Sequence, residues 1–468
     1  MTETTYDLIV IGAGAVGENI ADRAVQGGLT ALLVESELVG GECSYWACMP
    51  SKALLRSGIA LRAAKAVGGA REAVTGDLDV AATFKRRDGF TSDWDDQGQV
   101  DWVKGAGIDL VRGHARITGE KQLTVDDTVY TARHAIAVSV GSDPLLPDIR
   151  GLKDVSPWTS RHATSAKVAP KSLAIIGGGV VGVEMATAYA SFGTAVTVLA
   201  RTALLGNQEP FAGEAVTASL EKLGATVKVG VSATSAKRTD AGVELQLDDG
   251  STLTAEEVLV ATGRVPRTSD LGFDAIGLTP GDWLDVDDTL LVKGFDWLYA
   301  CGDVNHRALL THQGKYQARA AGDVIVARAL GKPVSDGKWG THVATADHEV
   351  VPQVTFSDPE VASVGLTAAA AQKAGYETRV IDYNLGWVAG AGLQADGYEG
   401  QARMIVDEKR TVILGVTFVG QDVSELIHAA TTAIVGEVPL DRLWHAVPAY
   451  PTMNEIWLRL LETYGRPD

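Results

Sequence analysis

Residues 6–28 read YDLIVIGAGAVGENIADRAVQGG, and the prediction of the fold starts from this stretch. The apolar run at its start predicts a buried strand, which is followed by a glycine-rich turn and a helix. Residues 172–195, SLAIIGGGVVGVEMATAYASFGTA, repeat the same order about 165 residues further along. Two strand–turn–helix segments of this kind predict an α/β protein with two Rossmann-like domains.

Both turns fit the pattern G-x-G-x-x-G. Glycines at this spacing permit a tight turn, the close approach of a pyrophosphate and close packing of helix on strand. The phosphates then lie at a helix N-terminus, where amide groups and the helix dipole favour anions. One such motif is a weak signal, but two in the right context indicate two dinucleotide sites. The glycines are Gly12, Gly14 and Gly17 in the first turn and Gly177, Gly179 and Gly182 in the second.

The two motifs differ at the end of the next predicted strand. Glu35 lies 18 residues after Gly17, where a carboxylate binds a ribose diol. The same step from Gly182 reaches Ala200, followed by Arg201. Without the carboxylate, a 2′-phosphate is not repelled, and Arg201 is able to pair with it. The second site is therefore expected to prefer NADPH to NADH. The alternative interpretation is that Arg201 is an ordinary solvated arginine without a role in binding.

The length, charge and cysteine content of the chain argue against several classes of protein. The 468 residues predict about three domains. The net charge is −18 without a Lys/Arg-rich run, which argues against a nucleic-acid partner. Three cysteines do not make a secreted disulfide framework. The first residues lack the features of a signal peptide, and no apolar stretch reaches the length of a membrane span, so we expect a cytoplasmic protein without membrane contact.

Further segments carry a family resemblance: GGECSYWACMPSK (40–52), ATGRVP (261–266), YACGDV (299–304), FSDPEVASVG (356–365) and PTMNE (451–455). With the two glycine motifs, their order and spacing resemble the flavin-dependent pyridine nucleotide–disulfide oxidoreductases, which include dihydrolipoamide dehydrogenase, glutathione reductase and mercuric reductase. The resemblance covers nearly the whole chain. It implies FAD and NADPH or NADH as cofactors, and a homodimer.

The same resemblance implies the domain plan and the cofactor contacts. Residues 1–150 would begin the FAD domain, 151–267 would form the NAD(P) domain, 268–345 would complete the FAD domain, and 346–468 would form an α+β dimer-interface domain. Asp303 would bind the ribityl chain, and Glu35 the adenosine ribose. Lys52 would lie near flavin N5 and pair with Glu184, since a buried lysine needs a carboxylate partner. Further expected contacts are Gly41, Ala115, Gly141, Gly263 and Arg264.

Cys43 and Cys48 admit three interpretations: a redox pair, part of a metal site, or two idle buried thiols. Residues five apart are separated by about 7.5 Å along a helix axis, whereas bridged Cα atoms prefer about 5.5–6 Å. A bridge therefore requires a bend in this segment. Zinc is disfavoured, because no second Cys pair and no His at ligand spacing are present. By resemblance, Cys48 lies against the flavin and Cys43 attacks the substrate. Cys301 is interpreted as a small buried filler.

Three departures from the family pattern bear on the chemistry. Glu42 stands where a threonine is usual, and a carboxylate beside Cys43 should raise the pKa of its thiol. Tyr45 and Trp46 are larger than usual and are expected to narrow or reshape access to the disulfide.

The third departure concerns the catalytic base. The family's histidine, in H-P-T-x-x-E, is Tyr450 here. A phenol, with a pKa near 10, is a poor base at neutral pH, and loss of the base would cost about 10²–10⁴ in rate. His445 is a candidate substitute. Glu455 has two interpretations, a catalytic partner of residue 450 or the end of a capping box with Thr452.

The sequence thus predicts an FAD-dependent NAD(P)H oxidoreductase resembling dihydrolipoamide dehydrogenase. Hydride would pass to FAD, then to the Cys43–Cys48 disulfide, and then to a small-molecule acceptor: a disulfide, a quinone or a metal ion. One alternative is a diaphorase that reduces quinones or metal ions without dithiol exchange. A second is a flavin-bound subunit of a larger complex with little turnover of its own.

Overall fold

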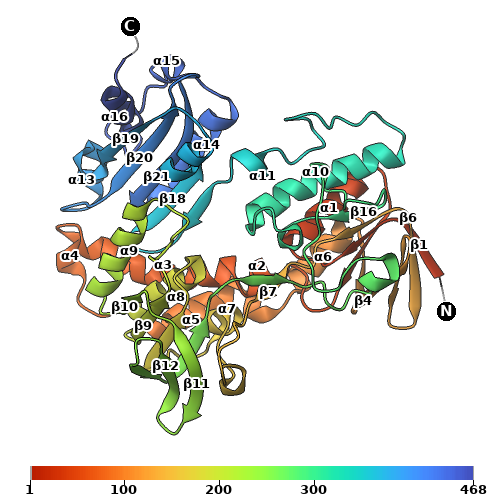
Figure 1. Ribbon diagram of the computed structural model, residues 1–468, viewed down its shortest axis with the longest axis horizontal. Helices are drawn as coiled ribbons and strands as arrows, with labels where there is room; N and C mark the ends of the chain where they lie inside the picture. Colours follow the sequence, from red (N-terminus) through yellow and green to blue (C-terminus); the bar gives the residue numbers. More distant parts are fainter. Residues whose placement is uncertain (1–2, 467–468) are drawn as a thin grey trace. The chain divides into compact units, whose positions relative to one another are not determined.

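The computed structural model describes residues 3–466, which divide into two compact units (Figure 1). Unit 1 comprises the chain up to Pro50, Arg87–Leu145 and Gly263–His348. Unit 2 comprises Ser51–Arg86, Leu146–Thr262 and the chain from Glu349 onward. Each unit is therefore assembled from three separate stretches of sequence.

Unit 1 is built on a seven-stranded sheet with the order β3-β2-β1-β6-β5-β4, in which β16 also pairs with β6. Strands β1, β2, β3, β6 and β16 run parallel, whereas β4 and β5 are antiparallel to their neighbours. The strands are β1 (Glu3–Ile11), β2 (Ala31–Glu35), β3 (Asp109–Arg112), β4 (Ala115–Gly119), β5 (Gln122–Val125), β6 (Thr128–Val138) and β16 (Leu298–Ala300), with the separate ribbon β7 (Ser142–Pro144) and β15 (Arg264–Pro266).

Helices cover this sheet, and α1 packs along α10. The helices are α1 (Ala15–Gln26), α2 (Gly41–Tyr45), α6 (Gln97–Gly105), α10 (Thr311–Ala329) and α11 (Ala346–Glu349), with 3-10 turns η1 (Ser92–Trp94), η3 (Phe273–Ile276) and η4 (Asp303–Asn305). Helices α3 (Cys48–Lys65) and α5 (Val80–Phe90) each cross a boundary of the division. In β1, residues 8–11 are buried on both faces, which is why this strand is a continuous apolar run.

Unit 2 contains three sheets. A parallel sheet, ordered β10-β9-β8-β14, carries the second glycine turn; a meander follows the order β11-β12-β13; and an antiparallel sheet follows the order β17-β18-β21-β20-β19. The strands are β8 (Ser172–Ile176), β9 (Ala195–Ala200), β10 (Thr226–Val229), β11 (Ala233–Thr239), β12 (Gly242–Leu247), β13 (Thr252–Ala255), β14 (Glu257–Val260), β17 (Gln353–Thr355), β18 (Glu360–Gly365), β19 (Thr378–Asn384), β20 (Gln401–Asp407) and β21 (Val412–Gly420).

The helices of unit 2 pack on these sheets. Besides α3 and α5 they are α4 (Ala70–Ala73), α7 (Ser160–Ser165), α8 (Val180–Ser191), α9 (Pro210–Lys222), α12 (Ala368–Lys373), α13 (Ala389–Gln394), α14 (Ile427–Val435), α15 (Leu440–Leu443) and α16 (Glu455–Tyr464), with η2 (Lys153–Val155), η5 (Leu385–Trp387) and η6 (Val423–Leu426). All nine residues of β21 are buried. Phe418 on this strand meets Trp457 of α16 edge to face at 5.5 Å, so the last helix closes this core.

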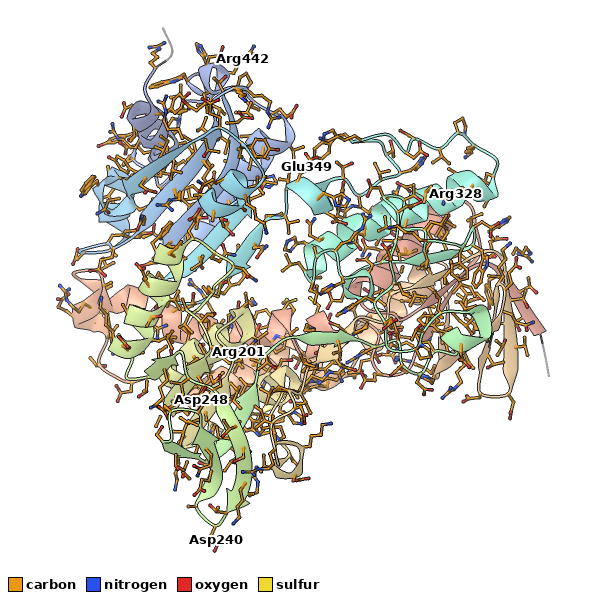
Figure 2. The ribbon with its side chains drawn as sticks, in the orientation of Figure 1. Arg201, Asp240, Asp248, Arg328, Glu349 and Arg442 are labelled. Atoms are coloured by element: carbon orange, nitrogen blue, oxygen red, sulfur yellow. The ribbon has the colours of Figure 1, made fainter. Side chains whose placement is uncertain are left out.

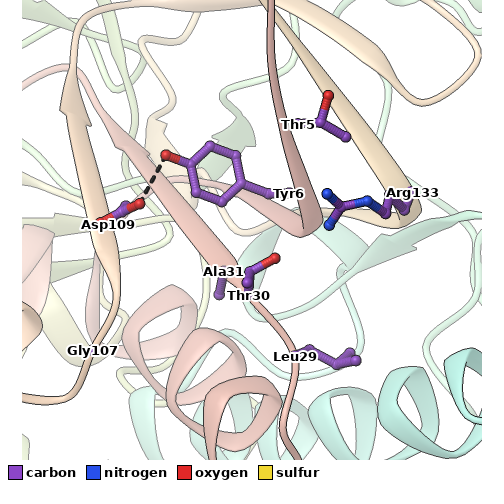
Figure 3. Close-up of a pocket in the computed structure, with 8 residues that line it drawn as sticks. All are labelled: Thr5, Tyr6, Leu29, Thr30, Ala31, Gly107, Asp109 and Arg133. Atoms are coloured by element: carbon purple, nitrogen blue, oxygen red, sulfur yellow. Dashed lines mark hydrogen bonds between the residues drawn. The ribbon is translucent and has the colours of Figure 1, made fainter.

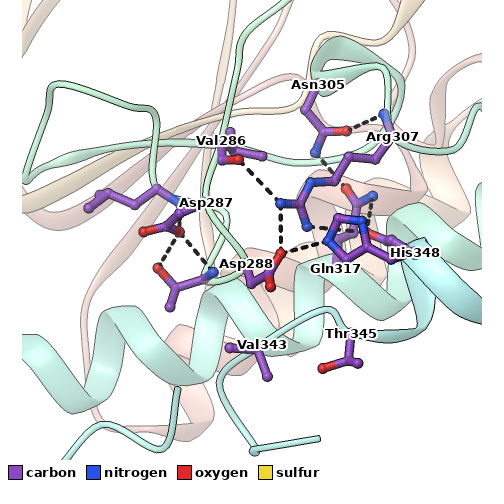
Figure 4. A network of polar contacts seen from close by, with 12 residues as sticks. Val286, Asp287, Asp288, Asn305, Arg307, Gln317, Val343, Thr345 and His348 are labelled. Atoms are coloured by element: carbon purple, nitrogen blue, oxygen red, sulfur yellow. Dashed lines mark hydrogen bonds and ion pairs between the residues drawn. The ribbon is translucent and has the colours of Figure 1, made fainter. Parts of the chain in front are cut away.

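A polar network fixes the end of unit 1 (Figure 4). Asp288 accepts a hydrogen bond from Arg307 at 2.9 Å and contacts His348 Nε2 at 2.7 Å. The His348 and Arg307 side chains hold the pKa of Asp288 below its ordinary value. Asp347 on α11 accepts bonds from Gln313 and Gln317 of α10, at 3.0 and 2.8 Å. The network ties α11 to α10 and to the residues that follow η4.

Candidate active site

The first glycine turn joins β1 to α1 and is closed by backbone contact. A Cβ on Gly17 would lie 1.9 Å from the carbonyl oxygen of Gly12, so a side chain there is excluded. Gly12 has a φ of 96°, which favours glycine. Gly14 is the N-cap of α1 and makes no side-chain capping bond. The first amide groups of α1 are thus free of side-chain competition, as an anion site requires.

Glu35 ends β2 beside this turn. Its Oε2 accepts a hydrogen bond from the amide of Ala13 at 2.7 Å, and its Oε1 accepts one from the amide of Glu37 at 2.8 Å. Burial raises the pKa of Glu35, and the two backbone donors oppose that shift. The carboxylate is therefore held in a fixed position at the carboxyl end of the strand, where a ribose diol binds in this fold.

The other predicted flavin contacts of unit 1 gather around the β7–β15 ribbon. The Ser142 hydroxyl donates to Asp303, and Arg264 donates to the Ser142 hydroxyl and lies 3.7 Å from Asp303. Gly141 and Gly263 flank the ribbon, and Ala115 begins β4 with its side chain buried. Together with the glycine turn and Glu35, these residues offer an anion site, a diol acceptor and a second carboxylate, and they fit FAD.

The segment that carries the two cysteines, residues 40–48, begins in contact with the first glycine turn. The amide of Gly40 donates to the carbonyl of Ala13 at 2.8 Å, and a Cβ on Gly41 would lie 2.8 Å from Gly14 Cα. Helix α2 ends at Tyr45, and α3 begins anew at Cys48. The bend expected between the two cysteines is confirmed. Cys43 and Cys48 are both half-buried.

Cys48 has a partner that the sequence did not indicate. Its Sγ lies 3.2 Å from Oγ1 of Thr311, the first residue of α10. A hydroxyl in this position is able to donate a hydrogen bond to a thiolate. The two residues are 263 positions apart, so no local pattern reveals the contact. A threonine before a helical run is an ordinary signal for the start of a helix, and it does not predict a contact with a cysteine.

The unusual residues around Cys43 are explained by their partners. Glu42 Oε2 lies 3.4 Å from Nη2 of Arg267, so its charge is offset by a cation, which was not anticipated. Tyr45 is only 3% exposed, and its carbonyl accepts a bond from Trp94 Nε1 at 3.1 Å. Tyr45 is thus part of the core, and the expectation that Tyr45 and Trp46 narrow or reshape access to the cysteines stays a prediction. Trp46 is half-buried and meets Tyr45 edge-on at 5.8 Å.

In unit 2, Lys52 on α3 and Glu184 on α8 form the expected ion pair. Lys52 Nζ lies 3.0 and 2.8 Å from the two carboxylate oxygens. Glu184 is 3% exposed and also accepts a hydrogen bond from the amide of Phe356 at 3.0 Å. The lysine ammonium lies 4.8 Å from the centre of the Phe356 ring. The pair is present, and the role of Lys52 towards a flavin stays a prediction.

The second glycine turn repeats the first. A Cβ on Gly182 would lie 2.1 Å from the carbonyl oxygen of Gly177, whereas one on Gly179 would meet nothing within 4 Å. Backbone contact between Gly177 and Gly182 thus leaves no room for a side chain at Gly182, whereas there is space beside Gly179. Strand β9 ends at Ala200, and the exposed Arg201 follows it (Figure 2).

The predicted acid–base residues, which all lie in unit 2, differ in their exposure. Tyr450 is 76% exposed, and His445 is also exposed. Glu455 is buried and forms an ion pair with Arg459 at 2.6 Å. The capping-box interpretation is wrong, because Thr452 donates to the carbonyl of Ala449 and Asn454 is the N-cap of α16. Cys301 is 1% exposed, and burial raises the pKa of its thiol, as expected of a core residue.

A separate pocket of unit 1, about 200 Å³ in volume, lies among the amino ends of β1, β2 and β3 (Figure 3). Tyr6 donates to Asp109 at 2.8 Å, and burial together with this bond raises the pKa of Tyr6 to about 12. Ligands of parallel α/β sheets bind at the carboxyl ends of the strands. The pocket lies at the amino ends of the strands, whereas the Gly12 turn follows the carboxyl end of β1. The pocket is therefore not the nucleotide site.

In residues 3–466, no group of three or more His, Cys, Asp or Glu side chains is arranged to hold a metal ion. No helix in this range combines the length and the apolar character needed to cross a bilayer.

Known proteins share these features. Residues 6–322 match the pyridine nucleotide-disulphide oxidoreductase family, and residues 351–460 match its dimerisation domain. The chain is 32% identical to dihydrolipoyl dehydrogenase of Thermus scotoductus, over 96% of this chain and 95% of that protein. It is 29% identical to mercuric reductase of Staphylococcus aureus, over 96% of this chain and 81% of that protein.

Among solved structures, the Cu(II) complex of the HOCl-induced flavoprotein disulfide reductase RclA from Escherichia coli shares the fold. Its TM-score is 0.84 at 22% identity, over 98% of this chain and 99% of that chain. The predicted α/β architecture, with two Rossmann-like domains and a C-terminal dimerisation domain, is confirmed. The chain belongs to the pyridine nucleotide–disulphide oxidoreductase family, as an FAD-dependent enzyme that uses NAD(P)H.

Proposed function

We propose that this protein is a cytoplasmic homodimer that reduces a small-molecule acceptor with electrons from NADPH by way of Cys43 and Cys48. One observation carries the proposal: the hydrogen bond from Gly40 to Ala13 attaches the cysteine segment to the turn that fits FAD. When bound, the flavin supplies hydride acceptance from NADPH and delivery of an electron pair to a disulfide. A dimerisation domain within residues 351–460 supports the homodimer.

The contact with Thr311 supports the roles that we propose for the two thiols. Reduction of the disulfide leaves one sulfur to attack the acceptor and one to be held as a thiolate. The Thr311 hydroxyl and the N-terminal end of the 19-residue helix α10 both favour negative charge on Cys48. Cys48 is thus the retained thiolate, and Cys43 is the attacking thiol.

Tyr450 shapes the choice of acceptor. Tyrosine replaces the family's histidine, and a phenol hydroxyl has no ring nitrogen that could accept a proton from Cys43 as a neutral imidazole does. An acceptor that needs this proton transfer, such as lipoamide or glutathione, is therefore disfavoured. Quinones, metal ions and disulfides with a good leaving group remain. The similarity to mercuric reductases supports keeping metal ions in this set.

The decisive experiment is an anaerobic NADPH titration of the wild type and Cys43→Ser. The wild type should take up a second electron pair beyond the pair held by the flavin, whereas Cys43→Ser should take up only the first. Reduction of a disulfide acceptor should fall by at least about 10³-fold in Cys43→Ser, because the attacking thiolate is lost.

Cys301→Ala is the matched control, because its thiol is buried in the core, and it should take up both pairs. If Cys43→Ser reduces quinones and the best disulfide acceptor as fast as the wild type, the protein is a diaphorase. If NADPH fails to bleach the flavin of the wild type, the docking-subunit interpretation is favoured.

A further inference from the structure

Arg267 lies among three carboxylates that come from two separate segments of unit 1. Its Nε donates to Asp143 at 2.6 Å, its Nη2 lies 3.4 Å from Glu42, and its Nη1 lies 3.7 Å from Glu37. The side chain is 27% exposed. Its backbone amide donates to the carbonyl of Gly141 at 3.2 Å, which fixes the residue at the end of the β7–β15 ribbon.

One of these carboxylates belongs to the residue that precedes the cysteine we assign as the attacking group. Glu42 precedes Cys43 in the short helix α2, and its side chain is 22% exposed. Negative charge on a neighbouring residue opposes ionisation of a thiol. Two more carboxylates, Glu37 and Asp143, add to the negative potential around Arg267. Arg267 lies within 4 Å of all three acids and offsets part of their negative charge.

We propose that Arg267 is a positioning residue that holds Glu42 and offsets its charge, so that Cys43 reacts as a thiolate despite the adjacent carboxylate. The inference rests on the proposed role of Cys43 as the attacking thiol. Arg267 acts through Glu42 and does not touch the reacting atoms. It also ties the start of α2 to the β7–β15 ribbon, whose Ser142 and Arg264 surround Asp303.

The test is the rate at which iodoacetamide alkylates Cys43 in the reduced protein near neutral pH, followed by peptide mass spectrometry. Arg267→Gln should slow alkylation by about 3- to 10-fold, the range expected for one uncompensated charge at a partly exposed site. Adding Glu42→Gln should restore the wild-type rate. At a pH high enough to ionise the thiol fully, all variants should react alike.

Controls separate electrostatics from folding. Arg133→Gln breaks an ion pair with Asp7 on β1 in the same unit and should leave the alkylation rate unchanged. Arg267→Lys keeps the charge and should retain at least half of the wild-type rate. An unchanged rate in Arg267→Gln, or a slow rate that Glu42→Gln fails to restore, would overturn the proposal.

This measurement needs no turnover, so it is independent of the test of function. If alkylation follows Arg267 and Glu42 as expected but Cys43→Ser takes up as many electrons as the wild type, the proposed function is wrong and the electrostatic role of Arg267 stands.

Discussion

The two glycine-rich turns of this protein have nearly the same backbone, and we propose that they bind different ligands. Each follows a buried parallel strand, opens a 12-residue helix and brings its first and last glycines into contact. They differ at the end of the next strand, which carries the anchored carboxylate Glu35 in unit 1, and Ala200 with the exposed Arg201 in unit 2. The shared backbone provides phosphate binding, and the strand end selects the nucleotide.

The largest expected effect comes from breaking each turn in the same way. Gly17→Ala places a Cβ against the Gly12 carbonyl and should yield protein without bound flavin. Gly182→Ala makes the equivalent clash with Gly177, but it should keep the flavin colour and lose at least about 10²-fold in kcat/KM for NADPH. Visible absorbance of the purified proteins and stopped-flow reduction measure these two outcomes.

Gly98→Ala is the control for both variants, because a Cβ there meets nothing within 4 Å. It should retain flavin and activity. Loss of flavin in Gly182→Ala would show that the two turns do not serve separate ligands.

An intermediate effect is expected from exchanging the strand ends. Ala200→Glu combined with Arg201→Ser introduces a diol acceptor and removes the cation, so the ratio of kcat/KM for NADH to that for NADPH should rise by about 10- to 100-fold. This range corresponds to one charge-assisted hydrogen bond. Glu35→Gln is the matched variant at the other site: it should weaken FAD retention and leave the NADH/NADPH ratio unchanged. If the NADH/NADPH ratio of kcat/KM is unchanged in the double variant, residues 200 and 201 do not determine a preference for NADPH.

The smallest effect concerns the residue that follows the last glycine of each turn, which is Glu18 in α1 and Val183 in α8; both are buried. Burial raises the pKa of Glu18 from 4.5 to about 7, opposed by Lys315 and aided by Glu35. The folded state then binds this proton more tightly than the unfolded state, so the free energy of unfolding falls as pH rises from about 4.5 to about 7.

Glu18→Gln should remove this slope and gain about 1–2 kcal/mol of stability above that window, after a discount for screening. Chemical denaturation on either side of the window measures it. Glu120→Gln, at a carboxylate that is 72% exposed, should keep the wild-type slope. A Glu18→Gln variant with the same pH slope as the wild type would contradict the buried-acid interpretation.

Local sequence patterns predicted the features that depend on neighbouring residues. Both turns follow from glycine positions and apolar periodicity, and the bend between Cys43 and Cys48 follows from the spacing of the two cysteines. The capping box at Thr452 failed although its local pattern was right, because the Thr452 hydroxyl bonds to Ala449 and Glu455 bonds to Arg459. A four-residue motif does not show which of several possible hydrogen-bond partners a side chain will choose.

The sequence alone was enough to predict the fold class and the two glycine motifs, because each strand–turn–helix pattern is contained in a short stretch of chain. The redox role of Cys43 and Cys48 stays a prediction. What surrounds the cysteines could be learned only from the folded chain. Thr311 contacts Cys48 across 263 positions, and Arg267 contacts Glu42 across 225. Hydrogen bonds and ion pairs act only within a few ångströms. The packing of α10 along α1 and the place of Arg267 just after β15 set those distances, and no spacing along the chain encodes them.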